Sequence, residues 1–296
     1  MTLICDCGST KAEWVLMNGD NVAKRFITNG FNPNFTDNLT INNIVDEVKN
    51  TIDNQDVSDV YFYGSGCGNV ANQLTIKLVL NSVSPKANTN VYPDTLAACH
   101  ALFGRNAGVA CILGTGSNAC VYDGEKITQS VVSLGFMLGD EGSGCHIGKR
   151  IVHDYFYKIM PDDLRAKFDA KYHLNRDTLL KNIYHDAAPS RYLAEFAMFA
   201  MENIDNQYIK DLVGGCFEEF LSSFLPEMST NTVISSEVEK SLTKKVAKLE
   251  LAFVGSVAFT FQSILLQVLE NHHLKCSKIL KNPMDGLIEY YKNVIA

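Results

Sequence analysis

A polar loop near the amino terminus carries residue types suited to phosphate chemistry. It reads Asp-Cys-Gly-Ser-Thr-Lys over residues 6–11 and follows an apolar, strand-like run. A glycine in such a loop lets backbone N–H groups approach phosphate oxygens without an intervening side chain. The aspartate can hold hydrated Mg²⁺, the two hydroxyls can donate to phosphates and the lysine can neutralise charge. These residues are Asp6, Gly8, Ser9, Thr10 and Lys11; a polar hairpin that binds nothing explains the segment as well.

A second glycine loop, Gly-Thr-Gly-Ser over residues 114–117, repeats the pattern of the first. Gly116 lies 108 residues after Gly8, and each follows an apolar run and precedes a serine, a strand-like run and a tight turn. Asn-Gly and Asp-Gly turns of this kind are typical of β-hairpins. The repeat predicts two similar hairpins with phosphate-binding loops, although two small loops of this type also occur by chance in α/β proteins.

Other nucleotide-binding motifs fail on their context. The nearest match to a P-loop, residues 143–150, lacks the first glycine and ends Gly-Lys-Arg. Residues 114–119 satisfy the GxGxxA pattern, but strand and turn residues follow where a dinucleotide-binding fold needs a helix. We therefore expect neither motif to be functional.

Two aspartates follow strand-like or glycine-rich segments and precede helical ones. Asp94 comes just after the run 89–92 and Pro93, so it can cap a helix or act as a general base at a strand end. The two roles are compatible. Asp140 lies in a segment of two acids and three glycines before a helix, where it can position a ligand hydroxyl or form a solvated acidic turn.

Two further polar segments are candidates for ligand contacts. Asn34 belongs to an Asn-Pro-Asn sequence in the polar loop 28–36, whose amides can bind sugar hydroxyls or simply form a turn. Gly255 and Ser256 end an apolar run. There a flat adenine can approach the backbone, or a helix can pack closely.

Composition excludes several classes of protein. The formal net charge of −7 and pI of about 5.5 provide no basic surface for nucleic acid. The apolar runs are far shorter than a membrane span, and Asp6 lies where a signal peptide needs an apolar core. The nine cysteines include no CxxC motif, and the histidines form no HExxH motif. We expect a soluble, cytoplasmic protein whose cysteines are core residues, with no nucleic-acid or membrane partner.

The coarse pattern alternates strands and helices. Apolar runs predict strands over 2–5, 12–17, 59–63, 89–92 and 249–254. Helical spacing predicts helices over 41–52, 71–80, 148–159, 194–220, 257–269 and 284–295. This alternation indicates an α/β architecture.

Taken together, these segments resemble the N-acetylglucosamine kinase branch of the sugar-kinase and actin-like ATPase superfamily, related to the BadF/BadG/BcrA/BcrD ATPases. The resemblance depends on Asp-Cys-Gly-Ser-Thr at 6–10, Leu-Gly-Thr-Gly-Ser-Asn at 113–118, Gly-Phe-Met-Leu-Gly-Asp-Glu-Gly-Ser at 135–143 and Val-Gly-Ser-Val-Ala at 254–258. It implies two ribonuclease H-like domains with a cleft between them. The expected domains are residues 1–106, rejoined by the tail 283–296, and residues 107–282.

The resemblance also implies roles for single residues. Asp94 corresponds to the base that accepts the proton of the sugar hydroxyl, and Asp6 to a ligand of the Mg²⁺ water shell. The residues expected to hold the sugar are Asn34, Ser117, Asn118, Gly135 and Asp140. Those expected to contact ATP are Gly8, Ser9, Thr10, Lys11, Gly114, Thr115, Gly116, Gly255 and Ser256. The implied reaction is γ-phosphoryl transfer from ATP to O6 of an amino sugar such as N-acetylglucosamine, by a protein that forms a homodimer.

The sequence departs from the family at Cys7, where a glycine is usual, and it lacks the cysteine-rich zinc motif of the bacterial repressor/ORF/kinase group, so no structural zinc is predicted. Two other functions stay open. One is a regulator that binds ATP or a sugar without turnover. The other is an iron–sulfur ATPase with a ligand at Cys99, although that cysteine falls within a predicted helix, 96–103.

Overall fold

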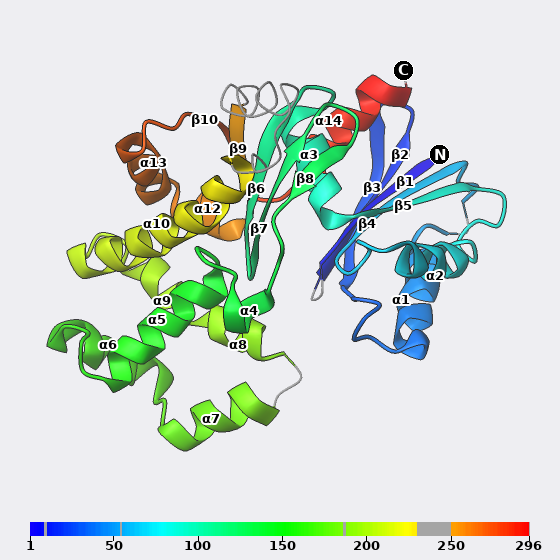
Figure 1. Ribbon diagram of the computed structural model, residues 1–296. Helices are drawn as coiled ribbons and strands as arrows, with labels where there is room; N and C mark the ends of the chain where they lie inside the picture. The colour runs from blue at the N-terminus through cyan, green and yellow to red at the C-terminus, as the bar shows by residue number, and fades with distance from the viewer. Residues whose placement is uncertain (9–10, 54, 186–187, 230–249, 296) are drawn as a thin grey trace. The chain divides into compact units, whose positions relative to one another are not determined.

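Each half of the chain builds a five-stranded mixed sheet. The computed structural model describes residues 1–8, 11–53, 55–185, 188–229 and 250–295. The chain divides into two units, Met1–Arg105 with Pro283–Ala296 and Asn106–Asn282. We call them the first unit and the second unit, and we describe each by itself (Figure 1).

The sheet of the first unit has the order β3-β2-β1-β4-β5. Its strands are β1 (Thr2–Cys7), β2 (Lys11–Asn18), β3 (Asn21–Asn29), β4 (Asp59–Gly64) and β5 (Asn88–Pro93). The strands β1, β4 and β5 run parallel, and β2 is antiparallel to both β1 and β3. The carboxyl ends of β1, β4 and β5 therefore meet at one edge of the sheet.

Four helices cover this sheet: α1 (Asn38–Thr51), α2 (Val70–Leu80), α3 (Asp94–Phe103) and α14 (Met284–Ile295). Asp37 caps α1 and Asn69 caps α2, each accepting a backbone N–H from the first turn. Trp14 and Phe62 belong to the core that α1 and α2 complete. The contact between α14 and α3 needs a glycine, because a Cβ on Gly286 would lie 2.5 Å from the carbonyl oxygen of Ala101.

A buried hydrogen-bonded network joins the sheet to α3 and α14. The Tyr63 hydroxyl lies 2.7 Å from Nδ1 of His100 in α3 and 2.6 Å from the Tyr291 hydroxyl in α14. Burial lowers the pKa of His100 to about 4, so this imidazole is neutral at pH 7. The C-terminal helix, drawn in red in Figure 1, is thus part of the first unit.

The sheet of the second unit has the order β10-β9-β6-β7-β8. Its strands are β6 (Gly108–Leu113), β7 (Ser117–Tyr122), β8 (Ile127–Ser130), β9 (Glu250–Val254) and β10 (Cys276–Leu280). Here β6, β9 and β10 run parallel, and β7 is antiparallel to β6 and β8. Order and directions match those of the first sheet, with β6 in the place of β1. The sequence repeat predicts the two hairpins within this match, β1–β2 and β6–β7.

The helices of the second unit include seven between β8 and β9, whereas the described residues between β3 and β4 of the first unit form only α1. They are α4 (Gly135–Leu138), α5 (Gly144–Phe156), α6 (Asp162–Tyr172), α7 (Arg176–His185), α8 (Pro189–Glu195), α9 (Ala197–Glu202) and α10 (Gln207–Ser229), and α12 (Ser256–Thr260) and α13 (Gln262–Asn271) follow β9. Buried aromatic rings such as Phe168, Phe217 and Phe253 fill the core between these helices and the sheet. Across the described residues, no helix has the length and apolar character needed to cross a bilayer.

The α/β architecture predicted from the sequence is confirmed, with local corrections. The helix predicted over 194–220 is interrupted, because α8, α9 and α10 are separate helices, and the helix predicted over 257–269 breaks at Phe261. The strand β3 was not predicted, and it includes the first two residues of the expected loop 28–36. Eight cysteines are buried and Cys276 is partly buried, as expected for core residues. Burial raises the pKa of the Cys67 and Cys145 thiols to about 12.

Candidate active site

Three polar side chains gather where the parallel strands of the first unit end. Asp6 is the last residue but one of β1, Ser65 follows β4, and Asp94 follows β5. The backbone N–H of Ser65 donates to the carbonyl of Cys7 at 2.9 Å, and its hydroxyl donates to Oδ2 of Asp94 at 2.8 Å. Ligands of open α/β sheets bind at this end of the strands.

Asp94 is held by hydrogen bonds to both carboxylate oxygens. Pro93 is the N-cap of α3, so Asp94 is the first helical residue rather than the cap. Its Oδ1 accepts the backbone N–H of Thr95 at 2.9 Å, and its Oδ2 accepts from Ser65. These two donors hold the carboxylate in one orientation at the start of α3. Each oxygen keeps a further lone pair, so Asp94 can accept a proton from a hydroxyl group.

The charges around Asp6 favour a cation. Burial, followed by the negative charges of Asp94 and Glu13, raises the pKa of Asp6 to about 7, and Lys11 opposes this shift. Carboxylates that repel each other fit a hard divalent ion, which prefers oxygen ligands and keeps several waters. Within the described ranges, no three histidine, cysteine, aspartate or glutamate side chains converge as a ligand group. The carboxylates around Asp6 therefore fit a Mg²⁺ ion that is held largely through water molecules.

A backbone hydrogen bond joins the two described ends of the first glycine loop. The N–H of Gly8 donates to the carbonyl of Lys11 at 3.0 Å. Lys11 is exposed, and its Nζ lies 3.8 Å from Oε2 of Glu13, whose Oε1 accepts from Nε of Arg25 at 2.6 Å. The expected phosphate ligands Ser9 and Thr10 lie outside the described residues.

Asn34 lies in the loop after β3 and is anchored to α2. Its backbone N–H donates to Oδ1 of Asn32 at 3.0 Å, and its Oδ1 accepts from Nδ2 of Asn72 at 2.8 Å. The side chain of Asn34 is exposed. The sequence singled out Asn34 but gave no signal for Asn72 or Ser65, because these contacts exist only in the folded unit.

In the second unit, Asp140 lies against the second glycine loop. Its Oδ1 accepts the backbone N–H of Ser117 at 3.1 Å, and a Cβ on Gly116 would lie 3.0 Å from both carboxylate oxygens. Asp140 itself has φ of 60°, an unusual value for a residue with a side chain and one associated with functional sites. Burial raises the pKa of Asp140, and the Ser117 N–H and the charge of Lys149 oppose that shift.

His146 fixes the segment that carries Asp140. Its Nδ1 accepts the backbone N–H of Gly142 at 3.1 Å, and its own N–H donates to Oγ of Ser143, the N-cap of α5. Its Nε2 lies 3.4 Å from Glu219 in α10. Burial lowers the pKa of His146, and only a neutral imidazole can accept at Nδ1. The sequence analysis missed His146, since one histidine on a helix gives no distinctive signal.

The structure separates two of the residues expected to hold a sugar. Ser117 and Asn118 are neighbours in β7, so their side chains project from opposite faces of the sheet. Oγ of Ser117 is buried without a hydrogen-bond partner among the described residues, and Oδ1 of Asn118 accepts the N–H of Ala119. A buried hydroxyl without a partner costs about 1–3 kcal/mol, so its retention suggests a function.

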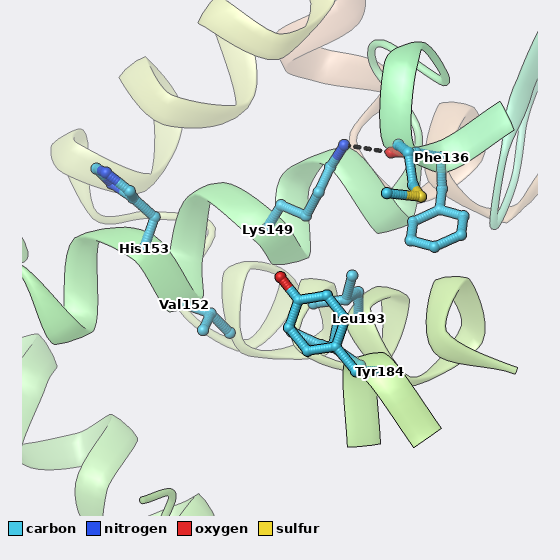
Figure 2. A pocket seen from close by; sticks show the side chains of 8 residues that line it. Phe136, Lys149, Val152, His153, Tyr184 and Leu193 are labelled. Carbon is cyan, nitrogen blue, oxygen red and sulfur yellow. Dashed lines mark hydrogen bonds between the residues drawn. The ribbon is translucent and has the colours of Figure 1, made fainter. Parts of the chain in front are cut away.

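Gly135 begins the short helix α4 with φ of 70°. Nζ of Lys149 donates to the next carbonyl, that of Phe136, at 2.6 Å and so ties α4 to α5. Figure 2 shows Lys149 extending to this carbonyl, with Tyr184 and Leu193 on the neighbouring helices. These residues line a pocket of about 340 Å³ with Met137, Val152, His153 and Ile183.

A second pocket, of about 140 Å³, brings together residues expected to contact ATP. Gly114, Thr115 and Ser256 line it with Gly144, Ala194, Ala197, Met198, Met201, Val257, Thr260 and Phe261. Gly255 has φ of 132°, and a Cβ there would overlap the carbonyl of Leu113, so the turn after β9 packs directly on the end of β6. The mostly apolar lining with a few polar groups suits a planar base. The small residues of α8 and α9 in this lining were not predicted.

Comparison with known proteins decides the family. The model of the BadF/BadG/BcrA/BcrD ATPase family matches residues 5–210. The chain belongs to this family. A search of curated proteins gave no match.

Solved structures of other proteins share this two-domain α/β fold. A protein from Porphyromonas gingivalis, named "Putative N-acetylglucosamine Kinase", is 34% identical, with a TM-score of 0.90 and full coverage of both chains. A protein of the same name from Chromobacterium violaceum shares the fold at 15% identity, with a TM-score of 0.68 and 98% of each chain covered. A ROK family glucokinase from Streptomyces griseus, in complex with glucose and AMPPNP, also shares it, at 13% identity and a TM-score of 0.52 over 98% of this chain and 97% of that one.

Proposed function

We propose that this protein is an ATP-dependent kinase that phosphorylates an amino sugar, N-acetylglucosamine, on its 6-hydroxyl. The observation that carries the proposal is the carboxylate of Asp94, held by Ser65 and Thr95 at the ligand-binding end of the strands, with Asp6 near enough for their charges to interact. Membership of an ATPase family supports ATP as the donor. The choice of sugar follows from the name of the 34% identical relative.

Asp94 would act as the general base. As the sugar oxygen bonds to the γ-phosphorus, the hydroxyl proton passes to the Asp94 carboxylate and the bond to the β-phosphate oxygen breaks, which releases ADP. Such transfer needs in-line positioning and charge neutralisation more than covalent chemistry. The hydrogen bonds from Ser65 and Thr95 keep the carboxylate in one orientation.

The nucleotide contacts are assigned residue by residue from the family motifs. Asp6 would hold the water shell of Mg²⁺, which neutralises phosphate charge when bound. We assign the phosphates to Gly8, Ser9, Thr10, Lys11, Gly114, Thr115 and Gly116, and the adenosine to Gly255 and Ser256. The pocket beside Thr115 and Ser256 supports the adenosine assignment through its apolar lining.

The sugar would be held by polar groups from loops and strand ends. Oδ1 of Asp140 accepts from Ser117, and its Oδ2, which accepts no hydrogen bond from the described part of the chain, can accept from a sugar hydroxyl. We assign the remaining contacts to Asn34, Ser117, Asn118 and Gly135. Carboxylates and amides are the usual partners of sugar hydroxyls because they hydrogen-bond in defined directions.

The test is release of ADP from Mg-ATP in the presence of amino sugars, plain hexoses and muramic acid derivatives. We expect turnover with N-acetylglucosamine and a product phosphorylated on O6, which phosphorus NMR of the product can verify. Turnover on a different sugar corrects the substrate and keeps the kinase. ATP binding without turnover on any sugar contradicts the proposal and favours a regulator.

A further inference from the structure

The amide of Asn34 is held in one of its two possible orientations by a neighbour that has no assigned role. Nδ2 of Asn72, in the first turn of α2, donates to Oδ1 of Asn34 at 2.8 Å and to the backbone carbonyl of Gly66 at 2.7 Å. A carbonyl oxygen can only accept, so the Asn72 amide must point its NH₂ group toward the Gly66 carbonyl and Asn34. Asn34 must then turn its oxygen toward Asn72.

The backbone around this pair is fixed independently. The N-cap Asn69 accepts the N–H of Asn72 at 2.8 Å, which sets the start of α2. The loop of Asn34 is closed by the bond from its N–H to Asn32, and a Cβ on Gly66, whose φ is 80°, would overlap Oδ1 of Asn32. The two loops therefore pack in one register, and the Asn34 and Asn72 amides face each other.

We propose that Asn72 is a positioning residue that makes Asn34 a hydrogen-bond donor toward the sugar. With Oδ1 engaged by Asn72, Nδ2 of Asn34 makes no hydrogen bond among the described residues and is the group left to bind a ligand. The sugar atom opposite Asn34 must then be an acceptor, such as a hydroxyl or acyl oxygen. This inference rests on the proposed function, because it takes Asn34 to contact the sugar.

The sharpest test is Asn72→Asp, which exchanges a donor for an acceptor with little change of shape. The new carboxylate can only accept, so the Asn34 amide must rotate and present its oxygen to the acceptor atom of the sugar. We expect the KM for the sugar to rise roughly 10- to 100-fold, while the KM for ATP and kcat change by less than about twofold. Asn72→Ala, which frees the amide without reversing it, should raise the sugar KM only about threefold.

Gln73→Ala is the matched control. Gln73 is the next residue of α2, and its Nε2 donates to the carbonyl of Cys67 in the same loop at 2.8 Å without touching Asn34. A general loosening of the loop would raise the sugar KM in this variant too, and that result would overturn the positioning role. Thermal unfolding of each variant checks that it is folded, and Asn72→Ala carries the test if Asn72→Asp does not fold.

Asn34→Ala separates this inference from the proposed function. If wild-type protein turns over a sugar but Asn34→Ala leaves its KM unchanged, the contact proposed for Asn34 is wrong. If Asn34→Ala raises the KM and neither Asn72 variant does, Asn72 has no positioning role. In the Asn34→Ala background, Asn72→Asp should add nothing, and a further increase in KM would show that Asn72 acts without Asn34. Absence of turnover on every sugar overturns the proposed function and this inference together.

Discussion

The loop after β1 in the first unit and the loop after β6 in the second occupy matching places in two sheets of the same order, yet different groups surround them. In the first unit, carboxylates border the loop: Asp6 in β1, Glu13 in β2 and Asp94 after β5. In the second unit, Gly114 and Gly116 form the loop after β6, and the turn of Gly255 packs on the end of that strand. The nearby carboxylate there, Asp140, comes from the long helical insertion and bonds to backbone.

This difference suits the two sheets to different tasks. Carboxylates at strand ends can hold a cation and accept a proton, whereas exposed backbone and small side chains leave room for a flat base and phosphates. We therefore assign proton transfer and Mg²⁺ to the first unit, and adenosine to the second.

Asp94→Asn should lower kcat roughly 10²- to 10⁴-fold, because an amide has the shape of the carboxylate but cannot take up the hydroxyl proton. ATP binding, measured by calorimetry, should stay within about threefold of wild type. Asp59→Asn is the matched control, since Asp59 begins β4 and so lies at the opposite end of the parallel strands. Turnover of Asp94→Asn close to that of the control would remove proton transfer from the first unit.

When a chelator removes Mg²⁺, the free energy of unfolding should depend on the protonation of Asp6. Its pKa in the fold is about 7, against about 3.9 in an unfolded chain, so the folded state binds more protons between these values. The free energy of unfolding of the metal-free protein should therefore fall as the pH rises from about 4 to above 7. The loss attributable to Asp6 is up to about 4 kcal/mol.

Urea unfolding of wild type and Asp6→Asn in chelator, at several pH values across this window, isolates the contribution of Asp6. The difference in stability between the two proteins should grow in favour of the variant as the pH rises. Asp20→Asn, at an exposed turn position, serves as control. A difference that stays constant with pH would show that Asp6 is ionised throughout.

Alanine substitution in the two glycine loops should have unequal effects on sugar binding. In Gly116→Ala the new Cβ lies 3.0 Å from both Asp140 oxygens, so that carboxylate must move. In Gly8→Ala the Cβ meets, among the described residues, the Lys11 carbonyl at an ordinary 3.5 Å. We expect the sugar KM to rise roughly 10-fold in Gly116→Ala and less than about twofold in Gly8→Ala. Equal sugar KM values in steady-state assays would contradict the role of Asp140.

The variants His146→Gln and His146→Asn should differ in their KM for the sugar by a small but measurable factor. An Asn side chain can place an oxygen where Nδ1 of His146 accepts the Gly142 N–H, whereas a Gln amide reaches only the position of Nε2. Loss of this neutral hydrogen bond should raise the sugar KM about 3- to 5-fold in His146→Gln, with His146→Asn within about twofold of wild type. The reverse order would mean that the contact with Glu219 matters more.

The sequence predicted the elements whose burial is visible in the hydrophobicity of their own residues. Buried strands such as β1 and β6 are continuous apolar runs, and the glycine loops after them revealed the repeat. The edge strand β3 was not predicted because it is exposed along most of its length. Its sequence therefore lacks the alternation of apolar and polar residues that identifies a strand. The breaks between α8, α9 and α10 were not predicted because apolar residues continue at helical spacing across them.

Candidate site residues divide in the same way. Asp6, Asp94 and Asp140 stand beside glycines or strand ends, where a carboxylate is conspicuous in the sequence. Ser65 and Asn72 act through partners 29 and 38 residues away, so only the fold brings each pair together. Positions that hold other side chains in place are thus the ones that local sequence patterns reveal least.

The docking of α14 on the first unit has a consequence for the order of events during translation. Its contacts, through Tyr291 and Gly286, are made by a segment that leaves the ribosome after the second unit. The second unit spans residues 106–282, so at a synthesis rate of about 5–20 residues per second the first sheet waits roughly 10–35 s for its last helix. During that interval, the surface of α3 that Gly286 later covers is open to other nascent chains and to chaperones.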